Sequence, residues 1–274
     1  MNNSQSDNLI IAGKNFTSRF LLGTGKFPNK QALHEAVTAS GSEIITVALR
    51  RIDLERHEEN ILEHIPDNIT LLTNTSGARN AKEAVRIARL ARESGYSHWI
   101  KVEVINDSKY LLPDNAETVK ATEALVKEGF TVLPYMYPDL YFARELAAAG
   151  AATVMPLASP IGSNRGLKTK EFIEILIHEI DIPIIVDAGL GAPSQAAAVM
   201  EMGADAVLIN TAVATAKHPA NMARAFAQAI AAGRTAFLSG LPAEKADADA
   251  SSPLTGFLYE NPKSEIRRKP EYRI

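Results

Sequence analysis

Eight short apolar runs, separated by longer amphipathic or alanine-rich stretches, constrain the fold of this chain more than any other feature of its sequence. Each run is rich in Val, Ile and Leu and has the length of a buried strand. The runs lie at residues 20–23, 43–49, 70–73, 99–104, 131–136, 153–157, 183–189 and 206–210. Between them, apolar residues recur at spacings of three and four, which predicts helices that include 80–94, 115–129 and 193–203. Strands that alternate with helices indicate a parallel sheet.

A loose internal repeat indicates how this sheet closes. The segments ASGSEIITVAL, AAGAATVMPLA and EMGADAVLINT each place a helix end, a glycine and a strand in the same order, with the glycine as the expected helix cap. Eight such units favour a single (β/α)8 TIM barrel of the α/β class. A barrel of about 250 residues fits a chain of 274 residues. An open, doubly wound sheet is the alternative.

The two ends of the chain are expected to lie outside the barrel repeat. Residues 9–23 predict an N-terminal strand pair with a turn at Gly13–Asn15, which would cover the bottom of the barrel. Beyond about Leu241 the sequence becomes polar and irregular. We therefore expect one barrel domain over residues 1–258 and a polar C-terminal tail over residues 259–274.

Composition excludes several classes of protein. The chain has no Cys, which excludes disulfides, zinc–thiolate sites and a Cys nucleophile, and its six His residues show no metal-ligand spacing. A net charge of −3 gives no indication of nucleic-acid binding. The apolar runs fall short of the roughly 20 residues of a membrane helix, and the N-terminus lacks the pattern of a signal peptide. We expect a cytoplasmic protein without a metal site.

The strand predicted at 99–104, WIKVEV, carries the strongest indication of chemistry. Because side chains alternate along a strand, Trp99, Lys101 and Glu103 share one face, and the aliphatic residues between them meet the helices. Lys101 and Glu103 then point into the barrel, roughly 7 Å apart. Desolvation favours a neutral amine, which is the nucleophile that a Schiff base needs. A structural Lys–Glu pair is the alternative, and the spacing alone does not separate the two.

Other polar residues follow the strands at the end of the barrel where active sites lie. Asp187 closes the apolar run PIIVD and would supply a second acid or base, unless it only caps a loop or a helix. Arg50 and Arg51 follow the second run. They either steer an acidic partner or substrate or form a salt bridge at the rim. The charges of the helix at 80–94 predict a solvated face.

Glycines after the last strands indicate a phosphate site. Gly189 and Gly191 follow the seventh run, and Asn210 and Thr211 follow the eighth, where barrels of this kind often hold a phosphate. Gly162, in the segment PIGSNRG, would close a third side. Tight strand–helix turns also use glycine, so each glycine alone is weak evidence. The segment GTGK at 23–26 lacks the spacing of a nucleotide-binding P-loop.

Several long stretches resemble the bacterial thiazole synthase family of thiamin biosynthesis. The resemblance runs from about Leu9 to Phe257. It is carried by FLLGTGKF, EIITVALRR, NTSGARNAKEAVRIARLARE, WIKVEV, YLLPD, EGFTVLPYM, VMPLASPIGSNRG, PIIVDAGLG, MGADAVLINTAVA and SSPLTGF. The resemblance implies a (β/α)8 barrel that is a transferase. It would build thiazole phosphate from 1-deoxy-D-xylulose 5-phosphate, dehydroglycine and the sulfur of a protein thiocarboxylate, without a metal or a redox cofactor.

The resemblance also implies roles for residues and partners. Lys101 corresponds to the lysine that forms the Schiff base, and Glu103 and Asp187 to the acid/base carboxylates. The sugar-phosphate contacts fall on Gly162, Ala188, Gly189, Asn210 and Thr211. The implied partners are a small sulfur-carrier protein with a C-terminal thiocarboxylate, an enzyme that supplies dehydroglycine, and further copies of this chain in a dimer or tetramer. The alternatives are a lysine Schiff-base aldolase for another sugar phosphate and a non-catalytic barrel that only holds the carrier.

Overall fold

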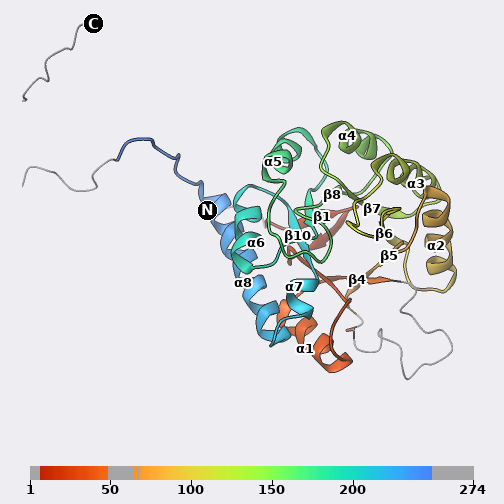
Figure 1. Cartoon of the computed structure of the whole chain (residues 1–274), viewed down its shortest axis with the longest axis horizontal. Coiled ribbons are helices and arrows are strands. Elements are labelled where there is room, and N and C mark those ends of the chain that lie inside the picture. Colours follow the sequence, from red (N-terminus) through yellow and green to blue (C-terminus); the bar gives the residue numbers. More distant parts are fainter. Residues whose placement is uncertain (1–6, 49–64, 67, 249–274) are drawn as a thin grey trace, which may run out of the picture. The chain divides into compact units, whose positions relative to one another are not determined.

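The computed structural model describes residues 7–48, 65–66 and 68–248. A strand lies at each of the eight predicted positions, and together they form one parallel eight-stranded sheet in the order β8-β7-β6-β5-β4-β3-β10-β9 (Figure 1). Isolated parallel bridges join Val154 to Ile184 and Leu157 to Asp187, and these bridges close the sheet into a barrel. The strands are β3 (Phe20–Gly23), β4 (Ile44–Ala48), β5 (Thr70–Asn74), β6 (Trp99–Val102), β7 (Thr131–Met136), β8 (Met155–Pro156), β9 (Ile185–Asp187) and β10 (Ala206–Ile209).

Helices surround the strands, as the spacing of apolar residues predicts (Figure 1). They are α1 (Lys30–Ser40), α2 (Ala81–Glu93), α3 (Asn115–Lys127), α4 (Leu140–Ala148), α5 (Lys170–Glu179), α6 (Pro193–Glu201), α7 (Thr211–Ala214) and α8 (Pro219–Ser239). In each of the three repeat segments the glycine after the helix has the left-handed backbone that ends a helix, with φ of 61° at Gly41, 88° at Gly150 and 99° at Gly203.

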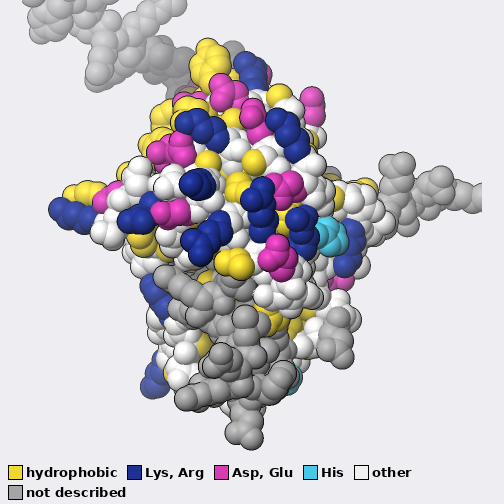
Figure 2. Space-filling view, turned by 90° about the vertical axis from the view of Figure 1, so that its right-hand side faces the viewer, with side chains coloured by type: hydrophobic (Ala, Val, Ile, Leu, Met, Phe, Trp, Pro, Cys, Tyr) yellow, Lys and Arg dark blue, Asp and Glu magenta, His cyan; other side chains and the backbone are white. Residues whose placement is uncertain are grey.

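The alternation along β6 sorts its residues between the lumen and the outer layer as predicted. Ile100 and Val102, with Val104 after the strand, are fully buried against Ala84, Ala88, Ala121 and Leu125 of α2 and α3. Lys101 and Glu103 face the lumen. On the outer side of these helices, Figure 2 shows Lys and Arg side chains interspersed with Asp and Glu, which is the solvated face that the sequence predicts. This face includes the ion pair between Arg89 and Glu128, 2.5 Å apart.

An N-terminal hairpin closes the bottom of the barrel. Strands β1 (Leu9–Ile11) and β2 (Lys14–Phe16) pair antiparallel, and Leu9, Ile11 and Phe16 pack against the residues that begin the barrel strands. The rings of Phe16 and Trp99 meet edge to face with centroids 5.8 Å apart. The turn was predicted one residue too late: it lies at Ala12–Gly13, both of which have positive φ. Lys14 belongs to β2.

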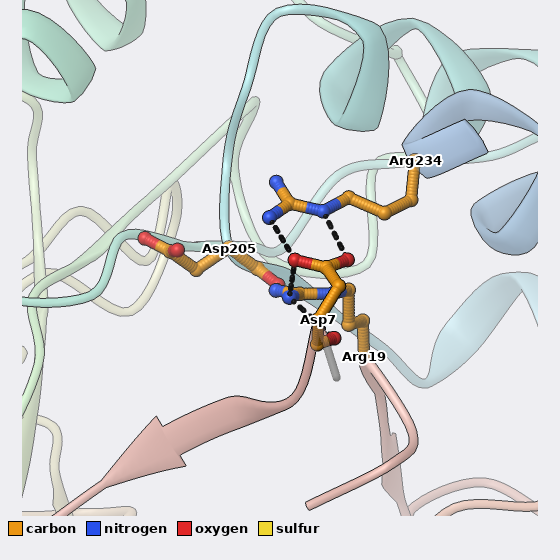
Figure 3. A network of polar contacts seen from close by, with 4 residues as sticks. All are labelled: Asp7, Arg19, Asp205 and Arg234. Atoms are coloured by element: carbon orange, nitrogen blue, oxygen red, sulfur yellow. Dashed lines mark hydrogen bonds and ion pairs between the residues drawn. The ribbon is translucent and has the colours of Figure 1, made fainter. Parts of the chain in front are cut away.

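A network of charges ties the N-terminal segment to the barrel at the same end (Figure 3). The Asp7 carboxylate accepts hydrogen bonds from Arg19 Nη2 at 2.9 Å and from Arg234 Nε and Nη2 of α8 at 2.8 and 2.6 Å. Arg19 Nη1 also donates to the carbonyl oxygen of Asp205, which immediately precedes β10, at 2.7 Å. The network therefore connects three segments that are far apart in sequence.

Compact packing ends with α8. The chain separates into one unit over Met1–Gly240 and a second over Leu241–Ile274. The predicted division between residues 258 and 259 lies outside the described residues, so it stays a prediction. None of the helices in the described ranges combines the length and the apolar character that a membrane span requires.

Candidate active site

A cavity of about 520 Å³ opens at the carboxyl ends of the strands. The residues that line it come from five of the eight strands and from the loops that follow β3, β5, β6, β8, β9 and β10. Eight of the predicted site residues line this one cavity: Lys101, Glu103, Gly162, Asp187, Ala188, Gly189, Asn210 and Thr211. Gly191, which was predicted in the phosphate loop, is not among the lining residues. Arg50 and Arg51 lie outside the described residues. The strand-end argument and the cavity therefore point to the same end of the barrel, and the roles of these residues stay predictions.

Three charged side chains meet in the lumen at the base of the cavity. Lys101 Nζ lies 3.3 Å from Glu103 Oε1 and forms a closer ion pair with Asp187 Oδ2. All three residues are buried, with 4%, 7% and 3% of their surfaces exposed. Asp187 ends β9, which is separated from β6 by two strands of the barrel, so its contact with Lys101 crosses the lumen. The lysine is therefore held between one carboxylate on its own strand and one from across the barrel.

The protonation of Lys101 differs from the expectation of a neutral amine. Burial lowers the pKa of Lys101, but the charges of Asp187 and Glu103 and their hydrogen bonds raise it more, so the pKa lies above its ordinary value. The amine is therefore an ammonium in the free site. A nucleophilic amine requires that one proton leave Lys101, and the two carboxylates are the nearest acceptors.

Thr75 holds the end of β6 in place and was not singled out from the sequence. Its hydroxyl donates to the carbonyl oxygen of Glu103 and accepts from the Glu103 amide, both at 2.8 Å. Its own amide donates to the carbonyl oxygen of Lys101 at 3.1 Å. These bonds extend the strand direction beyond Val102, and they keep the Glu103 carboxylate on the lumen side.

Tyr135 of β7 also faces the lumen and was missed by the sequence analysis. Its ring lies 5.3 Å from Lys101 Nζ, and its buried hydroxyl has no hydrogen-bond partner among the described residues. Burial, together with the charges of Asp187 and Glu103, raises the pKa of Tyr135 well above its usual range. The phenol therefore stays protonated and forms a neutral wall beside the charged group.

The opposite side of the cavity is formed by loops with left-handed backbone. Ala188 and Gly189 have φ of 58° and 77°, and Gly162 has φ of 73°. A Cβ on Gly189 would lie 2.4 to 2.7 Å from atoms of Ser159, so only glycine fits there. Positive φ at a residue such as Ala188 costs free energy and occurs most often at functional sites.

Hydrogen bonds at the start of α6 limit which backbone amides of the predicted phosphate loop are open to an anion. Gln195 Oε1 accepts from the amides of Gly191 and Ala192 at 2.7 and 3.1 Å. These two amides are therefore already bonded within the protein. Any anion at this loop would use the segment before Gly191. Across the described ranges, no three His, Asp or Glu side chains are grouped closely enough to hold a metal ion.

Comparison with known proteins identifies the family. The family model described as "Thiazole biosynthesis protein ThiG" matches residues 10–253. The chain belongs to the ThiG family. Two similar relatives, each named "Thiazole synthase", come from Acetivibrio thermocellus and Pelotomaculum thermopropionicum. Both are 64% identical, and the matches cover 92% and 93% of this chain and 99% of each relative.

Solved structures agree with the assignment to the ThiG family. A chain of the Amycolatopsis orientalis BexX/CysO complex is 34% identical, with a TM-score of 0.77, and the match covers 87% of this chain and 98% of that chain. A mandelate oxidase structure at 17% identity and a TM-score of 0.59, covering 85% of this chain and 79% of that one, shares the fold alone. The predicted family, the barrel fold and the thiazole synthase activity are confirmed. The aldolase alternative is not favoured.

Proposed function

We propose that this chain forms thiazole phosphate from 1-deoxy-D-xylulose 5-phosphate, dehydroglycine and thiocarboxylate sulfur through an imine on Lys101. The observation that carries the proposal is a single buried amine between two carboxylates, at the base of a cavity whose far side is made of glycine loops. A lysine between two acids has both the nucleophile and the proton acceptors that imine formation needs.

The first step follows from the charges around Lys101. The ammonium gives a proton to Glu103 or Asp187, and the free amine attacks the ketone carbon of the sugar. The carbon–oxygen bond breaks after the oxygen has been protonated, water leaves, and the imine remains. The positive imine nitrogen then accepts the electrons of a neighbouring carbon–hydrogen bond. The same two carboxylates would move protons while the carbonyl shifts along the sugar. The thiocarboxylate sulfur then attacks the new carbonyl carbon, and water cleaves the bond between the sulfur and the acyl carbon of the carrier, so that the carrier leaves as a carboxylate. Dehydroglycine adds to the resulting thiol and ketone, and the ring closes with loss of water.

The sugar phosphate would extend from Lys101 toward the loops of Gly162, Ala188, Gly189, Asn210 and Thr211. These residues lie on the same cavity as Lys101 but belong to other strand ends. Lys101, Glu103 and Asp187 together carry a net charge of −1. Because this charge repels a phosphate, the phosphate is favoured at the far side of the cavity.

A sulfur carrier would reach this site through its C-terminal tail. The BexX relative was crystallised with a second protein, CysO, which supports a protein partner for this chain. A flexible tail that ends in a thiocarboxylate would enter the mouth of the barrel above Lys101. We further propose that an enzyme supplying dehydroglycine acts beside this one in the cytoplasm, and that copies of this chain form a dimer or tetramer.

Borohydride trapping tests the imine. Protein incubated with 1-deoxy-D-xylulose 5-phosphate and borohydride should gain the mass of the reduced adduct, and peptide mapping should place that mass on Lys101. The Lys101→Ala variant should gain none. An adduct on another lysine would contradict the proposed role of Lys101. Thiazole formed without carrier thiocarboxylate would contradict the proposed sulfur source.

A further inference from the structure

Lys26 lies on the phosphate side of the cavity, in the loop that follows β3. Its Nζ is 2.8 Å from the point that a Cβ on Gly162 would occupy, and Thr211 Oγ1 is 3.6 Å from the same point. An ammonium from the β3 loop and a hydroxyl from the β10 loop therefore converge over a residue that has no side chain. A side chain at position 162 would fill the space between them.

The backbone of Lys26 is unusual for a residue of its type. Its φ is 68°, in the left-handed region that lysine rarely adopts. Conformations of this kind persist where the surrounding structure enforces them, and they cluster at ligand sites. Lys26 lies three residues before Asn29, the N-cap of α1.

Charge distinguishes Lys26 from the other cations of the cavity. Lys101 is held by Glu103 and Asp187. Arg79 is bound to Glu83 through two hydrogen bonds from its guanidinium. No carboxylate in the described part of the chain forms an ion pair with Lys26. Among the described cations that line this cavity, Lys26 is the one that has no carboxylate in an ion pair.

We propose that Lys26 binds the phosphate of the sugar substrate directly, with the phosphate seated over Gly162 between Lys26 Nζ and Thr211 Oγ1. This inference rests on the proposed function and adds to it a charged residue at the phosphate end. It also explains, beyond the positive φ, why a glycine occupies position 162: the absence of a side chain leaves the space in which the phosphate sits. The phosphate is then held by a cation at one end of the cavity while the carbonyl meets Lys101 at the other.

The test compares a phosphorylated and an unphosphorylated sugar. Lys26→Met removes the charge and keeps most of the length of the side chain. The KM for 1-deoxy-D-xylulose 5-phosphate should rise by about 10- to 100-fold with kcat within a few-fold of the wild type, because the lost contact is the same before and during the reaction. Borohydride trapping with 1-deoxy-D-xylulose, which lacks the phosphate, should be as efficient in Lys26→Met as in the wild type. Lys26→Arg should keep the KM within a few-fold.

Lys127→Met is the matched control, since Lys127 is an exposed residue at the end of α3 and its loss changes the net charge by the same amount. Lys127→Met should leave the KM for 1-deoxy-D-xylulose 5-phosphate and the trapping of both sugars unchanged. Inorganic phosphate should protect the wild type from trapping at concentrations that do not protect Lys26→Met. The inference is overturned if Lys26→Met leaves the KM unchanged, or weakens trapping of both sugars equally. A wild type that traps neither sugar would instead refute the proposed function, so the two failures are distinguishable.

Discussion

The barrel holds a cluster of charged side chains at each of its ends, and the two clusters are opposite in composition. At the carboxyl ends of the strands, a lysine lies between two carboxylates, Glu103 and Asp187. At the amino ends, a carboxylate, Asp7, lies between two guanidinium groups, Arg19 and Arg234. The first, which we call the upper cluster, has an excess negative charge. The second, the lower cluster, has an excess positive charge. Both are held by residues from distant parts of the chain.

The two clusters differ in what their charged groups are able to do. In the lower cluster each carboxylate oxygen of Asp7 accepts from an arginine, and Arg19 also bonds two carbonyl oxygens. Arginine does not give up its proton in proteins, so the two cations of this cluster keep their charge, and we expect the cluster to serve stability. In the upper cluster the central group is a lysine, which can lose a proton, and it opens onto a cavity. We therefore expect a buried cation to mark a functional site here only where it can also change its protonation.

Removing the upper cation should have the largest effect. Lys101→Ala should lower turnover on the order of 10⁴-fold or more, because it removes the covalent step itself. It should also leave Glu103 and Asp187 facing each other without a cation, which costs about 3 kcal/mol of unfolding free energy at pH 8. Steady-state kinetics and urea unfolding measure the two losses.

The pH dependence of that stability loss separates charge repulsion from lost packing. In Lys101→Ala the two carboxylates repel each other when both are charged, and no cation lies between them to offset the repulsion. The folded state of this variant is then most favoured at low pH, and its unfolding free energy should fall relative to the wild type between pH 5 and pH 8. A difference that stays the same at both pH values would mean that the carboxylates do not repel each other.

Substitution of the carboxylates in the upper cluster should have the next largest effect. Glu103→Gln and Asp187→Asn should each lower kcat by about 10²- to 10⁴-fold, because an amide does not transfer the protons that the proposed steps require. The side chains keep their size, so folding should be retained. Borohydride trapping before and after each substitution shows whether the residue acts in imine formation or later. Full turnover in both variants would make the upper cluster as structural as the lower one.

The sequence predicts much of the upper cluster and none of the lower one. Period-two alternation in WIKVEV places Lys101 and Glu103 in the lumen. This could be predicted because alternation depends only on neighbouring residues of one strand. The protonation of Lys101 depends on Asp187 from across the barrel, which no local rule supplies, so desolvation alone gave the wrong direction. Lys26 was considered only against the spacing of a P-loop motif. Arg234 reaches Asp7 because α8 returns to the N-terminus, which is a property of the closed barrel.

Weakening the lower cluster should affect stability alone. Arg19→Met removes the guanidinium, which is 7% exposed as a side chain, and keeps most of its apolar stem. The carbonyl oxygen of Asp205 then loses its donor, and the unfolding free energy should fall by about 2 kcal/mol. The kcat and KM should stay within about twofold of the wild type, because the cluster lies at the opposite end of the strands. A large loss of turnover in a folded Arg19→Met protein would contradict the separation of roles between the two ends.

The smallest effect is expected at Asp7 itself, where pH provides the decisive comparison. The hydrogen bond from Arg234 and the charges of both arginines lower the pKa of Asp7 below its ordinary value of 3.8, in spite of partial burial. A lowered folded-state pKa stabilises the protein above the unfolded pKa and loses that contribution as the pH falls through the folded value. Asp7→Asn should therefore cost about 1 kcal/mol at pH 7, a figure reduced by solvent screening, and progressively less below pH 4.

Urea unfolding of the wild type and Asp7→Asn at pH 7, 5, 4 and 3.5 measures this dependence. Glu179→Gln is the matched control, because its ion pair with Arg144 is about half exposed on both sides and should contribute under about 0.5 kcal/mol at every pH. A pH-independent cost for Asp7→Asn would mean that Asp7 acts through its shape and hydrogen bonds rather than its charge. The lower cluster would then no longer be the electrostatic counterpart of the upper one.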